Sequence, residues 1–156
     1  MKALSMMQPV PELILQKKKL IETRTWKSDF LGEFYLHASN SFIESMIERF
    51  EFDKERLIKG ALVGKAEIRG LKVYNNLQEF NKDFNKHLVE VPKKLPTYGY
   101  ILENVKRLEK PIKLKGKLNF FEVNLWKFKN LLKRYKIKKY SDREEQDAET
   151  CEHPSC

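Results

Sequence analysis

Two side chains of opposite charge, Glu22 and Arg24, stand two positions apart early in the chain, with Lys19 just before them and Trp26 just after. Side chains two apart in an extended strand lie on the same face, so Glu22, Arg24 and Trp26 are expected to point the same way. The carboxylate and guanidinium can then pair, and the indole offers a flat surface on which a nucleobase can stack. These residue types suit a ligand better than a core. The alternative is a solvated ion-pair ladder, worth less than about 1 kcal/mol, beside an indole that only packs in the core.

The elements that position these residues follow from periodicity and from glycine and proline. Pro11 suits the first turn of a helix, which predicts a helix over about 11–18 between strands over 2–6 and 20–26. Ser41 with Glu44 three residues later matches a capping box and predicts a helix that starts there. We expect further strands over 33–38, 60–74, 98–104 and 117–123, a helix over 77–88, and Pro111 in the connection between the last two strands.

Several blocks of the chain match a known pattern in order. The chain reads Leu4, Ser5, Gln8 and Pro9, then an apolar helix, then Lys19, Glu22, Arg24 and Trp26. With the blocks 34–39, 60–66 and 98–116, this order resembles the ASCH domain (activating signal cointegrator homology) of the PUA-like superfamily, over residues 2–125. Val10 stands where the family often has tryptophan, and Lys17 where it usually has glycine.

The resemblance implies a PUA-like barrel with a cleft around Lys19, Glu22 and Arg24 that binds RNA or a nucleotide without catalysis. In such a cleft Lys19 would meet a phosphate or carbonyl, Glu22 would accept hydrogen bonds from a base, and Arg24 would orient Glu22 or take a phosphate. Further candidates for the cleft are Ser5, Gln8, Trp26, Ser39 and Lys65. Gln8 with Pro9 is equally well explained by a plain turn, and for Ser39 a helix cap is the favoured explanation.

An enzymatic alternative comes from the same resemblance. Some small bacterial ASCH proteins hydrolyse N4-acylated cytidine with a K-T-I-T-x-R motif, whose lysine and second threonine are catalytic. Here Lys19 matches the lysine of the motif, but Glu22 stands in place of the second threonine. Lys19 and Glu22 could therefore form a catalytic pair only if Glu22 acted as a general base on water. Because the hydroxyl nucleophile is missing, binding without catalysis is the favoured interpretation. A third class, a protein-binding adaptor, also stays open.

The charge of the chain is unevenly divided. The net charge is +9, but residues 141–156 carry six acidic residues against Arg143, so this tail is −5 and the remainder is +14. A body this basic favours RNA, with DNA as the alternative, as partner, because each neutralised phosphate releases counterions. The alternative is a lysine-rich surface that only keeps the protein solvated. The tail also holds Cys151, His153 and Cys156, too few ligands for a structural zinc site, and we expect neither a metal nor a cofactor.

The sequence therefore predicts an α+β protein built as a PUA-like small mixed β-barrel with short peripheral helices. The expected organisation is an ASCH-like domain over 1–125, a basic C-terminal helix over 126–140 packed on it, and a disordered acidic tail over 141–156. No apolar run approaches the roughly 20 residues that cross a membrane. Cysteines confined to the last six residues cannot staple the fold, which indicates a cytoplasmic protein.

Overall fold

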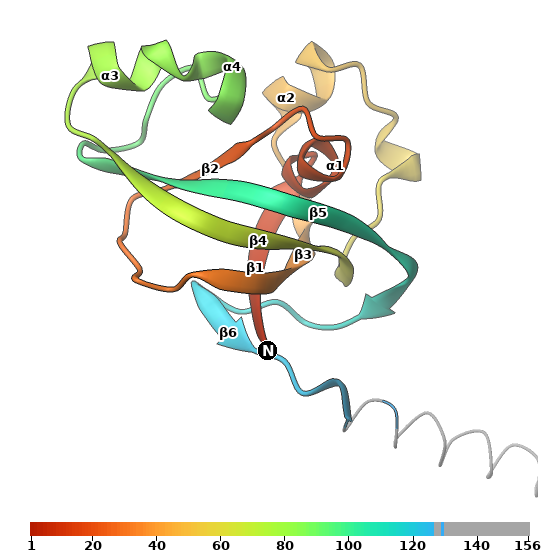
Figure 1. Cartoon of the computed structure of the whole chain (residues 1–156). Helices are drawn as coiled ribbons and strands as arrows, with labels where there is room; N and C mark the ends of the chain where they lie inside the picture. Colours follow the sequence, from red (N-terminus) through yellow and green to blue (C-terminus); the bar gives the residue numbers. More distant parts are fainter. Residues whose placement is uncertain (127–128, 130–156) are drawn as a thin grey trace, which may run out of the picture. The chain divides into compact units, whose positions relative to one another are not determined.

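A computed structural model describes residues 1–126 and 129 of the chain (Figure 1). Residues 1–122 form one compact unit, and the few described residues beyond it belong to a second one. The helix expected over 126–140 and the tail expected over 141–156 lie outside the described residues, apart from Trp126 and Lys129. Within the described part of the chain, no helix is long and apolar enough to cross a membrane.

Strands and short helices alternate along the compact unit. Their order is β1 (Lys2–Gln8), α1 (Val10–Leu15), β2 (Ile21–Arg24), β3 (Gly32–Phe42), α2 (Glu44–Arg49), a 3₁₀ turn (Lys54–Arg56), β4 (Ala61–Tyr74), α3 (Leu77–Lys82), α4 (Phe84–His87), β5 (Thr97–Lys113) and β6 (Phe120–Glu122). The long strands β4 and β5 run side by side across the centre of Figure 1. This content confirms the expected α+β class.

All six strands join one mixed sheet in the order β2-β5-β4-β3-β1-β6. β1 and β3 are parallel, and every other pair of neighbours is antiparallel. Within the described residues β2 and β6 are the two edges and do not pair with each other, so the sheet is not closed by strand pairing. The barrel is therefore not confirmed.

The parallel register of β1 and β3 decides which side chains become neighbours. Ser5 lies opposite His37, and Leu4 lies opposite Leu36. Leu4 and Leu36 are buried in the core, whereas Ser5 is only half-buried. The alternation of a strand thus gives β1 one apolar face for the core and one face that carries Ser5 beside His37.

Helix α1 ends in a sharp reversal that directs the chain into β2. Leu13 and Ile14 are fully buried. Lys17 has a φ of 59°, in the left-handed region that glycine occupies most readily. Its N–H bonds to the Ile14 carbonyl, and the Lys19 N–H bonds to the Leu13 carbonyl. A lysine in this conformation costs about 1 kcal/mol, and the reversal carries Lys19 back toward the sheet.

The capping box expected at Ser41 is wrong. Ser41 belongs to β3, which extends to Phe42 and pairs there with Gln8, and α2 begins at Glu44. Ile43 takes the position before the helix without a side-chain cap, and its N–H bonds to the Gln8 carbonyl at 2.8 Å. Strand pairing with β1 therefore outweighs the local capping signal.

Two other expected boundaries also differ. Strand β5 does not stop at residue 104 but continues through Pro111, since β2 pairs only with residues 98–101 and the outer edge of β5 beyond them needs no N–H donor. The helix expected over 77–88 is divided at Asp83 into α3 and α4. There the Asp83 carboxylate accepts hydrogen bonds from Tyr74, at 2.7 Å, and from Lys72. These contacts tie the break to strand β4.

Candidate functional site

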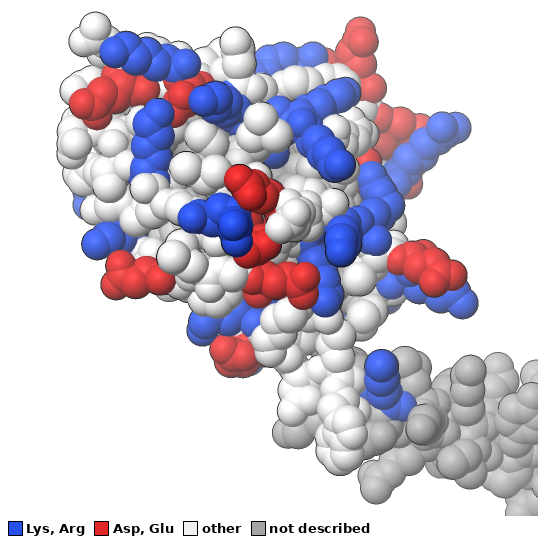
Figure 2. Space-filling view, in the orientation of Figure 1, with Lys and Arg blue, Asp and Glu red and all other residues white. Residues whose placement is uncertain are grey.

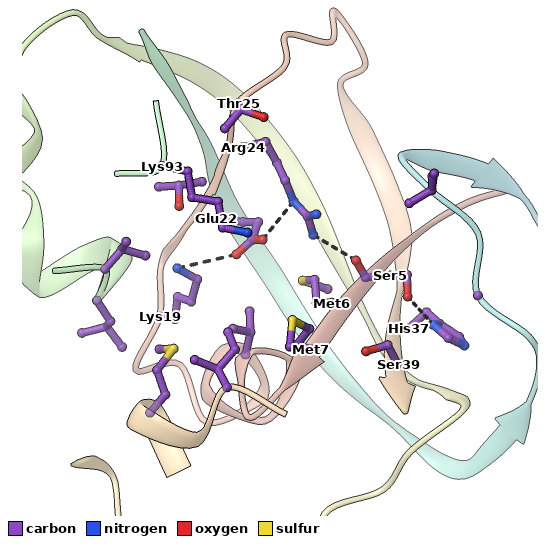
Figure 3. Close-up of a pocket in the computed structure, with 18 of the residues that line it drawn as sticks. Ser5, Met6, Met7, Lys19, Glu22, Arg24, Thr25, His37, Ser39 and Lys93 are labelled. Carbon is purple, nitrogen blue, oxygen red and sulfur yellow. Dashed lines mark hydrogen bonds and ion pairs between the residues drawn. The ribbon is translucent and has the colours of Figure 1, made fainter. Parts of the chain in front are cut away.

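One large cavity of about 980 Å³ opens in the compact unit. Its walls come from β1, β2, β3 and α2 and from two connecting segments, residues 88–93 and 114–119 (Figure 3). The volume lies at the upper end of the usual range for small-ligand sites, about 300–1,000 Å³. Of the residues proposed from the sequence, those that line it are Ser5, Lys19, Glu22, Arg24, Trp26 and Ser39.

A charged cluster stands on one wall of the cavity. The Lys19 Nζ lies 3.5 Å from Glu22 Oε2, and Arg24 Nε lies 3.1 Å from Glu22 Oε1, so one carboxylate faces two cations. Lys19 also donates to the backbone carbonyl of His87. Arg24 donates through Nη2 to the Ser5 carbonyl at 3.0 Å, which links β2 to β1. Figure 3 shows the three side chains pointing toward one another.

Burial makes this cluster unlike a surface ladder. The side chain of Lys19 is 1% exposed and that of Glu22 is 8% exposed, while Arg24 reaches 23%. Burial lowers the pKa of Lys19 from its ordinary value, Glu22 opposes this effect, and the positive charges of Arg24 and Arg49 add to it. The ladder interpretation is therefore wrong for Lys19 and Glu22. A buried lysine that faces one shared carboxylate is held in position, and its burial disfavours the charged form.

Trp26 both packs in the core and borders the cavity. Its ring centroid lies 5.8 Å from that of Tyr100 and 5.6 Å from that of Phe120, the latter edge-on. The Tyr100 hydroxyl donates to the Trp26 carbonyl at 2.9 Å, and the Arg24 guanidinium carbon lies 6.0 Å from the indole. The indole is thus packed in an aromatic cluster and also borders the cavity, and stacking on a base stays a prediction.

On β1 and β3, Ser5 and His37 form a hydrogen-bonded pair. The Ser5 Oγ lies 2.9 Å from His37 Nδ1, and His37 Nε2 lies 2.7 Å from the Leu114 carbonyl oxygen. Since a carbonyl can only accept, Nε2 carries the ring proton, Nδ1 is the acceptor, and the Ser5 hydroxyl donates to it. Both side chains line the cavity, with Ser39 near them (Figure 3).

Among the charged side chains that line the cavity, basic ones outnumber acidic ones. The acidic residues are Glu22 and Glu90, and the basic ones are Lys19, Arg24, Arg49, Lys93, Lys115 and Lys117. Arg49 on α2 holds the segment 88–90 by donating to the Leu88 carbonyl at 2.6 Å and to Glu90 at 3.0 Å. On the face of the molecule shown in Figure 2, by contrast, basic and acidic side chains are interspersed. The excess of positive charge is thus a property of the cavity more than of that face.

Two of the proposed site residues do not line this cavity. Gln8 is 1% exposed, and its side-chain amide donates to the Ile58 carbonyl at 2.7 Å, so it joins β1 to the segment before β4. Lys65 on β4 pairs with Glu33 at 2.8 Å and lies over the ring of Tyr35. The Lys65 ammonium therefore contacts residues of β3 and does not contribute its charge to the cavity.

The sequence analysis missed several residues that line the cavity. Among them are His37, Arg49, Lys115 and Lys117, none of which was proposed for the cleft. The glycine at 116 between two lysines marks a close approach: a Cβ there would lie 2.7 Å from both Ser5 Oγ and His37 Cε1. Among residues 1–126 and 129, no group of three histidine, cysteine or acidic side chains could hold a metal. The residues Cys151, His153 and Cys156 lie outside the described part of the chain.

Comparison with solved structures identifies the fold. The chain is similar to the crystal structure of ASCH from Zymomonas mobilis, with a TM-score of 0.61 and 10% identity, over 85% of this chain and 93% of that one. Structures of two mutants of that protein align over the same share of this chain, and over 94% and 96% of their own, with TM-scores of 0.57 and 0.53 at 10% and 11% identity. No protein-family model and no curated protein matches the sequence. The chain therefore has the fold of an ASCH domain.

Proposed function

We propose that this ASCH-like module binds RNA or a nucleotide in the cavity. The observation that carries the proposal is the lining, in which six basic residues face two acidic ones. Phosphate oxygens would be neutralised by the exposed lysines of the two connecting segments, Lys93, Lys115 and Lys117. A base would lie deeper in the cavity, near the fixed indole of Trp26.

In this proposal the cluster of Lys19, Glu22 and Arg24 recognises the ligand and does no chemistry of its own. The Glu22 carboxylate is already shared between the two cations. A ligand group that donates hydrogen bonds would join the Glu22 carboxylate, and a ligand carbonyl would compete with the His87 carbonyl for Lys19. Position 22 offers no hydroxyl for covalent acyl transfer, which argues against the amidohydrolase alternative at this cluster.

The test is a salt titration of RNA binding with matched triple variants. A fluorescently labelled single-stranded RNA is titrated with the wild type, with K93A/K115A/K117A, and with the control K17A/K18A/K82A. The control residues are equally exposed but do not line the cavity. The cavity variant should bind more weakly, and its slope of log affinity against log salt should fall by about 2. Equal losses in the two variants, or no binding to RNA at low salt, would refute the proposal.

A further inference from the structure

A second part of the cavity has the geometry of a nucleophile and its base. Ser5 Oγ is hydrogen-bonded to the acceptor nitrogen of His37, and the other ring nitrogen donates to the Leu114 carbonyl. These hydrogen bonds connect a side chain that could attack to a base that could take its proton. They also connect that base to a group that fixes its tautomer. Neither residue has a role in the proposed RNA or nucleotide binding.

The surroundings hold this pair rigidly and keep it accessible. Ser5 and His37 sit opposite each other on parallel strands, so the sheet itself sets their separation. His37 is 1% exposed, with its ring edge-on to Phe121 at 6.0 Å between centroids. Ser5 is half-buried and borders the cavity. The Arg24 guanidinium contacts the backbone oxygen of Ser5 at 3.0 Å, which fixes a positive charge beside that residue.

We propose that Ser5 is a catalytic nucleophile, with His37 as its general base, and that the pair hydrolyses an acyl ester carried by a phosphate-bearing alcohol. Ser5 Oγ attacks the acyl carbon while its proton passes to His37 Nδ1. The bond from the acyl carbon to the alcohol oxygen breaks, and His37 returns the proton to that oxygen. Water then attacks the acyl-serine and loses its proton to His37. The bond from the acyl carbon to Ser5 Oγ breaks, and His37 returns the proton to Oγ, which releases the acid and regenerates the Ser5 hydroxyl.

The choice of substrate follows from two features. The outer nitrogen of His37 is held by a neutral carbonyl rather than by a carboxylate, so the imidazolium formed during the reaction gains little stabilisation, which suits an ester better than the less reactive amide. The phosphate follows from the basic lining of the cavity and rests on the proposed function. The covalent step itself does not depend on it.

Labelling with a small fluorophosphonate tests the pair without any bound anion. Ser5 Oγ would attack phosphorus and displace fluoride, and mass spectrometry of the intact protein and its peptides would show one adduct, on Ser5. S5A should abolish the adduct, and H37Q should slow its formation by at least about 100-fold. The matched control is S45A, which removes another hydroxyl from the cavity and should be labelled like the wild type.

A purely structural hydrogen bond would not give a reactive hydroxyl. Thermal melting of each variant confirms that it is folded. No adduct on Ser5, or equal labelling of the folded H37Q variant, would overturn the assignment and leave RNA binding untouched.

The substrate class is tested with a matched pair of esters, 3′-O-acetyl-AMP and 3′-O-acetyladenosine, with release of acetate as the readout. The phosphate-bearing ester should be hydrolysed at least about 10-fold faster in terms of kcat/KM, and S5A should abolish both reactions. Equal rates for the two esters would overturn the phosphate requirement, and no release of acetate from either would overturn ester hydrolysis.

Discussion

Glu22 is expected to hold the charged cluster together, and replacing it by glutamine should expose this role. Glu22→Gln leaves Lys19 and Arg24 facing a neutral amide, while Lys19 stays 1% exposed. Removing one partner of a buried ion pair typically costs about 3–5 kcal/mol, because the remaining charge is buried without compensation. For a chain of this size each kcal/mol moves Tm by about 2–4 °C, so we expect a decrease of about 6–20 °C at neutral pH.

The matched control is Glu33→Gln. Glu33 pairs with Lys65 at 2.8 Å, but these side chains are 49% and 29% exposed. Breaking this solvated pair should change the free energy of unfolding by less than about 1 kcal/mol. The double variant K19M/E22Q removes the stranded ammonium as well and should recover a large part of the loss seen in E22Q.

The pH dependence supplies a second readout. Burial lowers the pKa of Lys19 in the folded state, so between that value and the unfolded pKa of about 10.4 the unfolded chain binds more protons. The free energy of unfolding should therefore rise with pH across this window. Without Glu22, which opposes the lowering, the window should begin at a lower pH. Stability of E22Q within about 1 kcal/mol of the wild type, or a double variant less stable than E22Q, would refute this reasoning.

Three other outcomes are expected. Gly64→Ala should lower the free energy of unfolding by about 1–3 kcal/mol, because the new Cβ would overlap Leu15 and lie 2.7 Å from a backbone oxygen. The control Gly70→Ala, whose Cβ would have its nearest neighbour at 3.5 Å, should melt close to the wild type. The Lys72 ammonium and the Tyr74 hydroxyl lower the pKa of Asp83 to about 2, so this carboxylate stabilises the fold above its ordinary pKa of 3.8. The free energy of unfolding should fall by about 1 kcal/mol as the pH falls from about 4 to 2. This value is modest because Lys72 is half-exposed, and the variant Asp83→Asn should lack this pH dependence. Deleting residues 141–156, of net charge −5, should tighten RNA binding, most at low salt, because a tethered acidic tail competes with RNA for basic residues. Equal affinities, or weaker binding after the deletion, at two salt concentrations would contradict this competition.

Element types were predictable from the sequence, and their boundaries were less so. Each described strand begins within two residues of its expected start apart from β6, which starts three residues late. Errors arise where tertiary contacts outweigh a local signal. Ser41 is drawn into β3 by pairing with β1, and Pro111 is tolerated within β5 because the adjacent edge is open. Neither circumstance is visible in the residues nearby.

The two parts of the candidate site differed in how far the sequence could show them. Glu22 and Arg24 lie on one strand, so a period of two is enough to predict that they share a face. The pairing of Ser5 with His37 needs the parallel register of two strands that are 32 residues apart in sequence, and the backbone carbonyl of Leu114 that orients His37 leaves no trace in the side-chain pattern. Arg24 spans both parts, because it pairs with Glu22 and also binds the Ser5 carbonyl. An anion drawn to Arg24 would therefore act on the position of β1 at Ser5, which couples binding at the charged cluster to the geometry of the nucleophile.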